Sequence, residues 1–397
     1  MKIIIISDWH LGVDWGTELE MDSFAHLLQA FSQIKEENPD LILVSGDIFN
    51  ETVPSQEIFF EVINFFSNLD LDNKIGITNN GKKLKYPIVC IEGNHEYRGK
   101  DFKSAVQLLE AMGFLKRLNL ESISVFNEDE KINIFGIGSF PDKYFLDILN
   151  KWSPIPERGA YNILLMHQSF REFLPFESND EIPSLSNLPK GFNVIVNGHL
   201  HWSYKTMLND NEYFIMPGST TTTQNKKIEA DNPKGFFVLN TKTNEFLFKE
   251  INGTRPIFYL DLHFENSSIN QVLGKIKSEL DIIKQKKLFK KPLIRIRLKG
   301  DLEKGYFLKD LNLKDIEKDY PDFYISFSVK LNEKGLKESI NTIQELQKQK
   351  RSLEDISRDV FFEQISQTNV SKDFDYKRLF EILYNDDLEK AKDFIFL

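Results

Sequence analysis

Cysteine and long apolar runs are nearly absent from this sequence. Its 397 residues include one cysteine, Cys90, which excludes a disulfide within the chain and is typical of proteins from reducing compartments. The apolar residues 1–6 are too few for the core of a signal peptide. No stretch approaches the roughly 18 apolar residues of a membrane-spanning helix. These absences predict a cytoplasmic protein without a membrane partner.

An excess of positive charge is also absent. The chain has 50 Lys and Arg residues against 60 Asp and Glu residues, which gives a formal net charge of -10. That balance argues against a protein whose whole surface binds nucleic acid. It leaves open a local basic surface, and bound cations would offset clustered carboxylates. Apolar residues make up an ordinary 41% of the chain, so there is enough material for a large core.

Short apolar runs alternate with amphipathic segments through the first 250 residues or so. Short continuous β-branched runs are typical of strands that are buried on both faces. Strands are therefore expected at 2–6, 41–44, 88–91, 132–137, 162–166, 194–196, 213–216, 236–239 and 246–249. Helices are expected at 21–37, 56–68 and 104–118. This alternation predicts a layered α/β domain over residues 1–252.

The pattern changes near Arg255. Alternating runs at 257–264, 293–298 and 323–329, with an amphipathic segment at 269–284, predict a small α+β module over residues 253–331. Residues 332–351 are rich in Lys, Gln and Glu and are expected to be a linker. Two amphipathic segments, 352–368 and 374–396, predict a helical hairpin within residues 352–397. The polar stretch 70–85 is interpreted as a surface loop.

Five short polar motifs each follow a predicted strand. They are Asp8-Trp9-His10, Gly46-Asp47, Gly93-Asn94-His95, His167-Gln168 and Gly198-His199-Leu200-His201. The carboxyl ends of strands in an open α/β sheet converge on one crevice, which is the usual ligand site. Each motif alone is more often a simple turn than a ligand pair. Five of the seven histidines lie in these motifs, however, and that distribution is not expected of histidines buried for packing.

The donor atoms of these motifs suit a centre of two divalent metal ions. The oxygen donors are Asp8, Asp47 and Asn94, and the imidazole donors are His10, His167, His199 and His201. A set without thiolate fits manganese, iron or zinc, and it is too rich in histidine for calcium or magnesium alone. A carboxylate such as Asp47 can bridge two ions, and such a pair promotes displacement at phosphorus. The glycines before Asp47, Asn94 and His199 are expected to let the backbone turn.

The motifs, taken in this order, resemble those of the calcineurin-like metallophosphoesterases over about 250 residues. The resemblance implies an α/β fold, a four-layer α/β/β/α sandwich, here followed by the α+β module and the C-terminal helical hairpin. It implies one metal ion held by Asp8, His10, Asp47 and His201. It implies a second ion held by Asp47, Asn94, His167 and His199. His95 would act on the scissile phosphate, as proton donor or charge stabiliser.

Further features resemble one branch of that family, the meiotic-recombination-eleven and SbcD nucleases of DNA double-strand-break repair. The sequence has Asp-Trp-His-Leu-Gly at 8–12, Gly-Asp-Ile-Phe at 46–49, Pro-Gly-Ser at 217–219 and Thr-Arg-Pro at 254–256. It departs from the branch at Asn50, where His or Asp is usual, and at Glu96, where Asp is usual. The resemblance implies a manganese-dependent DNA exonuclease and endonuclease that acts on DNA ends, and a location with the nucleoid if the source is prokaryotic.

The same resemblance implies roles for other segments. The module 253–331 would be a cap that faces DNA. Residues 352–397 would bind an SMC-like ATPase, although docking on their own chain is the alternative. The helices 56–68 and 104–118 have wide apolar faces and would form a homodimer interface, although packing on the sheet is the alternative. Lys286, Lys287, Lys290 and Lys291 form a basic cluster that fits a phosphate backbone. The alternative is a solvated helix end and strand edge.

Two other functions remain open from the sequence. One is a phosphodiesterase of small molecules or nucleotides on the same scaffold. The other is a non-catalytic scaffold that bridges DNA and the ATPase. The complete set of candidate ligands argues against the second, and the cap and the apolar C-terminal segments argue against the first.

Overall fold

The computed structural model describes residues 1–79, 81–98, 102–127, 130–174, 182–333, 353–366, 374–384 and 388–396. The chain divides into two compact units, of which the first contains Met1–Tyr259 with Leu288–Arg295 and Asp322–Tyr324. The second contains Leu260–Lys287, Ile296–Pro321 and Ile325–Leu397. Nearly all of the predicted linker 332–351 lies outside the described residues. Within the described part of the chain, no helix is long and apolar enough to cross a membrane.

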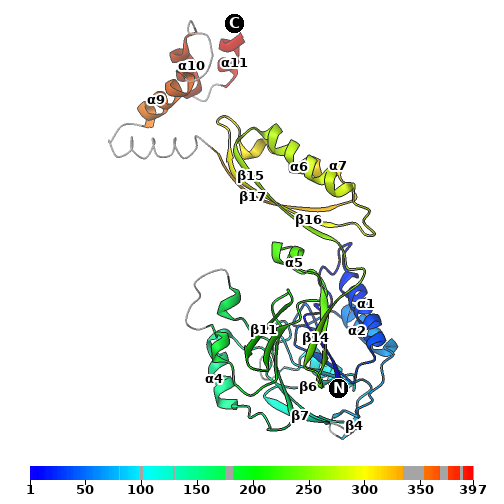
Figure 1. The fold of residues 1–397 in the computed structure, drawn as a ribbon. Coiled ribbons are helices and arrows are strands. Elements are labelled where there is room, and N and C mark those ends of the chain that lie inside the picture. Colours follow the sequence, from blue (N-terminus) through cyan, green and yellow to red (C-terminus); the bar gives the residue numbers. More distant parts are fainter. Residues whose placement is uncertain are drawn as a thin grey trace. The chain divides into compact units, whose positions relative to one another are not determined.

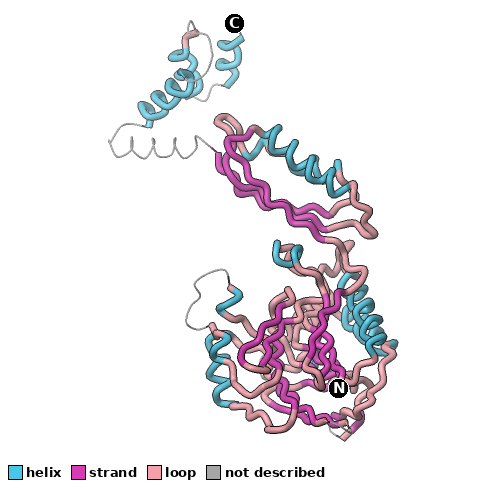
Figure 2. The backbone as a smooth tube through the Cα atoms, in the orientation of Figure 1, coloured by secondary structure: helices cyan, strands magenta, loops and turns pink. Residues whose placement is uncertain are grey.

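Two six-stranded sheets form the centre of the first unit (Figures 1 and 2). In spatial order, the first sheet contains β14 (Glu245–Glu250), β13 (Gly235–Asn240), β1 (Lys2–Ile6), β2 (Leu41–Val44), β5 (Ile88–Cys90) and β6 (Lys116–Arg117). The second contains β11 (Tyr204–Asn209), β12 (Glu212–Met216), β10 (Val194–Asn197), β9 (Tyr161–Met166), β8 (Lys131–Gly136) and β7 (Glu121–Phe126). The central strands of each sheet run parallel, and antiparallel strands flank them.

Alternation along the central strands builds the layers of this unit. Ile3 and Ile5 of β1 share a core with Ile163 of the second sheet, so the two sheets face each other. Ile4 and Ile6 point to the other side and pack beneath three helices. These helices are α1 (Asp22–Glu37), α2 (Gln56–Asn68) and α3 (Ala105–Ala111), and α4 (Asp142–Trp152) packs on the outer face of the second sheet. The predicted four-layer α/β/β/α sandwich is confirmed.

Besides α4, β11 and α5 (Lys227–Asp231), which were not predicted, three details of the first unit differ from the expectation from sequence. The helix predicted at 104–118 ends at Ala111, because Gly113 adopts φ +81° and the chain then enters β6. The strand β7 was not predicted, because it is an edge strand whose side chains are mostly exposed. The stretch 70–85 contains a short hairpin, β3 (Thr78–Asn79) and β4 (Lys82–Lys83). Ile77 and Leu84 flank this hairpin and are buried in the core between the sheets.

Later segments form smaller elements. A three-stranded sheet contains β15 (Ile257–Ser267), β16 (Leu293–Leu302) and β17 (Tyr324–Glu333). The helices that accompany it in sequence are α6 (Ile269–Lys284) and α7 (Leu313–Asp319). The C-terminal helices are α9 (Leu353–Ser366), α10 (Tyr376–Tyr384) and α11 (Leu388–Phe396), so the single helix predicted at 374–396 is two helices. The remaining short elements are the helix α5 (Lys227–Asp231) and the 3-10 turns Arg171–Phe173, Leu185–Asn187 and Leu308–Asp310.

Candidate metal centre

The seven candidate ligands stand on loops at the carboxyl ends of five central strands, and the structure brings all of them together. Four of them, Asp8, His10, Asp47 and His199, have positive φ angles of 52°, 45°, 49° and 77°. Side chains other than glycine rarely adopt this conformation, and each case costs on the order of 1–3 kcal/mol unless its surroundings impose it. Hydrogen bonds between loops hold these conformations. Asp8 N donates to Gly46 O (3.1 Å) and His10 N donates to Asp47 O (3.0 Å), and His199 N donates to Asp8 Oδ1 (3.0 Å).

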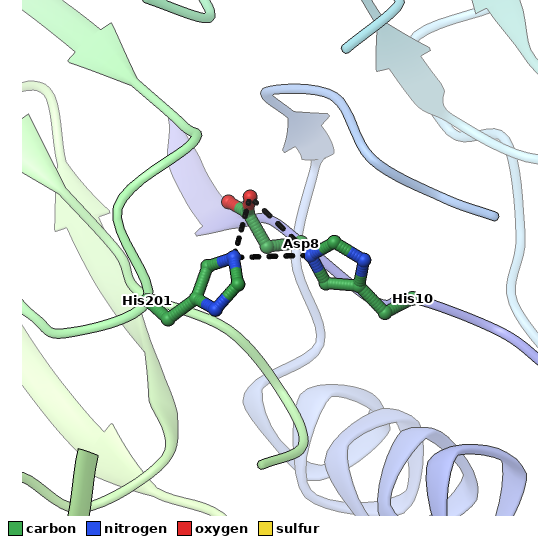
Figure 3. Close-up of side chains that lie close together, drawn as sticks. All are labelled: Asp8, His10 and His201. Atoms are coloured by element: carbon green, nitrogen blue, oxygen red, sulfur yellow. Dashed lines mark hydrogen bonds and ion pairs between the residues drawn. The ribbon is translucent and has the colours of Figure 1, made fainter. Parts of the chain in front are cut away.

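Asp8, His10 and His201 form the first half of the centre, which is buried (Figure 3). His10 Nε2 lies 3.1 Å from His201 Nε2. Asp8 Oδ1 lies 3.9 Å from His10 Nε2 and 4.0 Å from His201 Nε2. Asp8 Oδ2 is buried and has no hydrogen-bond partner among the described residues. Two imidazole nitrogens and a carboxylate that converge in this way fit a cation between them.

Burial sets the protonation of this half. It raises the pKa of Asp8 to about 6, with a contribution from the neighbouring carboxylate of Asp47. It lowers the pKa of His10 to about 3, and the proximity of His201 lowers it further. His10 is therefore neutral at physiological pH, which is the form of imidazole that binds a metal ion.

Asp47, Asn94, His167 and His199 form the second half. Asn94 Oδ1 lies 3.0 Å from His167 Nε2 and 2.9 Å from His199 Nδ1. Asp47 Oδ2 lies 3.2 Å from His167 Nε2, and it also lies 3.7 Å from His10 Nε2 in the first half. The carboxylate of Asp47 therefore stands between the two halves, where it could bridge two ions.

Charge coupling dominates the second half. Burial would raise the pKa of Asp47, but His167 and His10 lower it below its ordinary value. Burial would likewise lower the pKa of His167, but Asp47 raises it to about 10. Burial and the proximity of His167 lower the pKa of His199 to about 3. The cationic His167 and the anionic Asp47 thus hold each other in place when no metal ion is bound.

A buried hydrogen-bond chain fixes the orientation of His201, and it was not predicted from the sequence. His201 Nδ1 lies 2.5 Å from Thr223 Oγ1, and Thr223 Oγ1 lies 3.4 Å from Glu229 Oε1. The carboxylate can only accept, so the hydroxyl donates to it and accepts from Nδ1–H. This assignment leaves the lone pair of Nε2 for a metal ion. Outer carboxylates of this kind orient metal-binding histidines in many proteins.

Lys234 neutralises that carboxylate inside the protein. Its ammonium group donates to Glu229 Oε2 (2.8 Å), Ser219 Oγ (2.8 Å) and His201 O (3.1 Å), so all three of its protons have acceptors. Burial lowers the pKa of Lys234. Burial would raise the pKa of Glu229, but the imidazole of His201, whose Nδ1 lies 3.4 Å from Glu229 Oε1, and the charge of Lys234 lower it to about 2. In the sequence, one Glu and one Lys in a polar segment gave no signal of this role.

The second half is braced mainly by the main chain and by Glu96. His167 Nδ1 donates to Ser45 O (2.7 Å), which directs Nε2 toward Asp47 and Asn94. The buried carboxylate of Glu96 accepts from the backbone N–H groups of Asp47 (3.1 Å), Phe49 (2.7 Å) and Gly93 (2.7 Å). Burial and the charge of Asp47 raise the pKa of Glu96 to about 8. The residue that departs from the family motif thus ties two ligand loops together.

The three motif glycines serve different purposes. Gly46 has φ +97° and makes the turn that was expected. Gly93 and Gly198 do not have positive φ, so these two positions do not need the left-handed backbone that favours glycine. A Cβ atom on Gly93 would lie 2.1 Å from Asp47 Oδ1, and one on Gly198 would lie 2.1 Å from Ser45 O. These two glycines therefore allow neighbouring loops to approach each other closely.

His95 lies at the junction of the two halves. Its Nδ1 is 2.5 Å from the backbone oxygen of Asn50 and donates to it, which leaves Nε2 on the side of the ligands. Its ring meets the ring of His10 edge to face at 4.8 Å. Its backbone N–H donates to Asp47 Oδ1 (3.0 Å). Because Asn50 acts through its backbone oxygen, the unusual side chain at this position does not affect the bond.

The predicted basic cluster is divided between the two units. Lys286 and Lys287 follow α6 and are exposed, and they belong to the second unit. Lys290 and Lys291 are partly buried and belong to the first unit. The ammonium group of Lys291 lies 3.9 Å from the centre of the Tyr324 ring and 3.7 Å from a carboxylate oxygen of Glu18.

Comparison with known proteins agrees with this geometry. The family model of the calcineurin-like phosphoesterases matches residues 1–203, just over half of the chain. The chain is 25% identical over 355 residues to the DNA double-strand break repair protein Mre11 of Sulfolobus acidocaldarius, which covers 86% of this chain and 87% of that protein. It is 24% identical over 320 residues to the same protein of Saccharolobus solfataricus, with 78% of each chain covered.

The matched region carries six of the seven gathered ligands within its first 200 residues, and His201 lies just inside its end. The chain therefore belongs to the calcineurin-like phosphoesterases, a family of metal-dependent hydrolases of phosphate esters.

Proposed function

We propose that this protein is a DNA nuclease that processes DNA ends in double-strand-break repair and uses two manganese ions. The observation that carries the proposal is the pair of adjoining donor groups that share Asp47. Such a site suits hydrolysis of a phosphodiester. The choice of DNA as substrate rests on the similarity to Mre11 proteins over most of the chain. The protein would act with DNA, in the cytoplasm or nucleoid.

The chain offers a complete ligand set for this chemistry. Asp8, His10, Asp47 and His201 would hold one ion. Asp47, Asn94, His167 and His199 would hold the other. When bound, the two ions supply an activated water and stabilise the oxygens of an in-line displacement at phosphorus. The mixture of histidine nitrogen and carboxylate or amide oxygen fits manganese.

His95 would act on the phosphate directly. Its ring is fixed by the bond from Nδ1 to Asn50 O, so Nε2 is the atom available at the junction of the two halves. From there it would donate a proton or stabilise charge on the departing oxygen. General acid catalysis of this kind contributes roughly 10²–10⁴-fold to the rate.

We assign the remaining segments by the same reasoning. Residues 1–252 would be the nuclease domain, 253–331 the cap that faces DNA, 332–351 a linker and 352–397 the helices that bind an SMC-like ATPase. The C-terminal helices leave Leu383, Leu388 and Ile395 exposed, at 38%, 63% and 49%. Exposed apolar side chains on short helices favour contact with a partner.

Lys286, Lys287, Lys290 and Lys291 are the proposed DNA-contacting residues. Replacement of Lys286 and Lys287, the exposed pair, by Glu is expected to weaken duplex binding. It is also expected to reduce the slope of log affinity against log salt concentration by roughly 0.9 for each of the two lost phosphate contacts. The matched control is the same change at Lys82 and Lys83, an exposed pair on β4. An unchanged salt dependence in the first variant would contradict this assignment.

We further propose a homodimer through α2 and α3. Most of the apolar side chains of the two helices pack on the sheet, but Phe60, Leu108 and Met112 remain 60%, 45% and 48% exposed. Phe60 and Leu108 line an apolar hollow of about 420 Å³. Replacement of Phe60 and Leu108 by Glu is expected to give a monomer by light scattering, and a wild-type protein that is already monomeric at micromolar concentration contradicts the dimer.

Cleavage of labelled linear duplex and hairpin DNA, with manganese or with a chelator, tests the central proposal. A small chromogenic phosphodiester is assayed in parallel. The proposal predicts manganese-dependent loss of full-length DNA. Hydrolysis of the small diester without cleavage of DNA would instead indicate a phosphodiesterase of small molecules. Two bound ions without hydrolysis of either substrate would indicate a scaffold.

A further inference from the structure

A hollow of about 330 Å³ opens beside the second half of the metal centre. Three ligands of that half, Asn94, His167 and His199, line it. Tyr97 and Phe140 are among its other lining residues. A group bound at these ligands would therefore extend directly into the hollow.

Phe140 and Tyr97 differ in their burial and in their contacts. Phe140 is partly buried and packs against the core cluster beneath the second sheet, which fixes its position. Tyr97 follows Glu96 in the third ligand loop and is 52% exposed. Within the part of the chain that the structure describes, the Tyr97 ring has no ring contact and its hydroxyl no hydrogen bond. Both residues also line a second hollow of about 190 Å³.

Two polar side chains that line the hollow, those of Gln168 and Ser169, are held by hydrogen bonds. Gln168 is buried, and its amide nitrogen donates to Phe140 O (2.9 Å) and to Asp142 Oδ1 (2.5 Å). The hydroxyl of Ser169 lies 3.1 Å from His199 Nε2. Flat aromatic walls with a few fixed polar groups are the usual features of a site for a planar, partly polar ring.

We propose that this hollow is a subsite for the base of the nucleotide that adjoins the scissile phosphate, and that Tyr97 stacks on that base. The inference rests on the proposed nuclease function. A phosphodiester held by Asn94, His167 and His199 carries a nucleoside on each side. The hollow is the space next to these ligands, and it exceeds what a phosphate group alone would fill.

The proposal makes Tyr97 a specificity-determining residue of this chain. Stacking of a base on an aromatic side chain is sequence-tolerant, because every base has a flat face. The site therefore recognises the presence of a base at the cleaved position rather than its identity. A nucleotide without a base is then a poor substrate and a weak ligand.

Equilibrium binding tests the subsite without any cleavage. The manganese-loaded protein is titrated with a deoxynucleoside 5′-monophosphate and with deoxyribose 5-phosphate. Wild type is expected to bind the nucleotide roughly tenfold more tightly, since stacking contributes that order of affinity. The Tyr97→Ala variant is expected to bind both ligands equally, and Tyr97→Phe to keep the preference. Tyr144→Ala is the matched control, because Tyr144 is 51% exposed and does not line the hollow.

Cleavage of DNA separates failure of this inference from failure of the proposed function. The substrates are duplexes with a normal or an abasic nucleotide at the cleaved position. Normal cleavage with no penalty for the abasic nucleotide, or a binding preference that persists in Tyr97→Ala, overturns the subsite and leaves the nuclease intact. Absence of any DNA cleavage by a protein with two bound ions overturns the nuclease itself.

Discussion

The two halves of the metal centre fix their histidines by different means. In the first half, Thr223 and Glu229 orient His201 through side-chain hydrogen bonds, and Lys234 balances the charge. In the second half, the main-chain oxygen of Ser45 orients His167. Side-chain braces can be removed by substitution, whereas a main-chain brace cannot. The first half is therefore the one whose metal affinity depends on residues far from the ligands in sequence.

The halves also differ in their access to solvent. Asp8, His10 and His201 are buried, whereas Asn94 is exposed and His199 is partly exposed beside the open hollow. A buried ion pair such as Glu229 and Lys234 stabilises only when all of its hydrogen bonds are formed, because removal of charges from water is costly. The enclosed half has such a network. The open half is the one that a substrate can reach.

Substitution of the shared carboxylate should have the largest effect. Asp47→Ala removes the only ligand common to both halves, so both ions are expected to be lost and hydrolysis to fall below detection. Metal content after dialysis, measured by atomic emission, checks this. The control is Asp231→Ala, at an exposed carboxylate that pairs with Lys227 (3.2 Å). One ion retained by Asp47→Ala would show that the halves are independent.

Loss of the buried ammonium group of Lys234 should have the second-largest effect. Lys234→Met leaves Glu229 buried without its partner, and such a change costs about 3–5 kcal/mol of unfolding free energy. Urea denaturation of the metal-free protein measures it. The double variant with Glu229→Gln should recover most of the loss, because both charges are then absent. A loss below about 1 kcal/mol in the single variant would mean that water or another group reaches the carboxylate.

Removal of the brace alone should have a smaller and local effect. Glu229→Gln keeps the shape of the side chain but weakens the orientation of His201, and loss of such a contact lowers metal affinity roughly 10- to 100-fold. Calorimetric titration with manganese should show one weakened site and one unchanged site. Asp231→Asn, on the same short helix, should change neither. Equal weakening of both sites would remove the distinction between the halves.

The parts of the fold that could be predicted are those in which local pattern and burial agree. Continuous apolar runs such as Ile3–Ile6 mark strands covered on both faces, and these were predicted to within a residue or two. The edge strand β7 carries mostly exposed side chains and has no such run. The segment 104–118 has apolar residues on both sides of Gly113, and the left-handed backbone at that glycine ends the helix early.

The candidate site likewise contains residues that the sequence could predict and residues that it could not. Strand-end motifs predicted that Asp8, Asp47 and His167 lie together. Asp8 and Asp47 follow neighbouring parallel strands of the first sheet, which bring their ends to a common edge, whereas His167 follows a strand of the second sheet. The braces could not be found this way. Glu229 and Lys234 are charged residues in a polar segment, and their burial depends on the tertiary fold. The close approach at Gly93 and Gly198 likewise depends on loops that are distant in sequence.

The most direct test of the nuclease assignment is DNA cleavage by a His95→Asn variant. The amide nitrogen of Asn can replace Nδ1 as the donor to Asn50 O, while Nε2 is removed. Wild type is expected to cleave linear duplex DNA with manganese. The variant is expected to keep two bound ions and to lose cleavage by roughly 10²–10⁴-fold. Undiminished cleavage by His95→Asn, with two ions bound, would contradict the account.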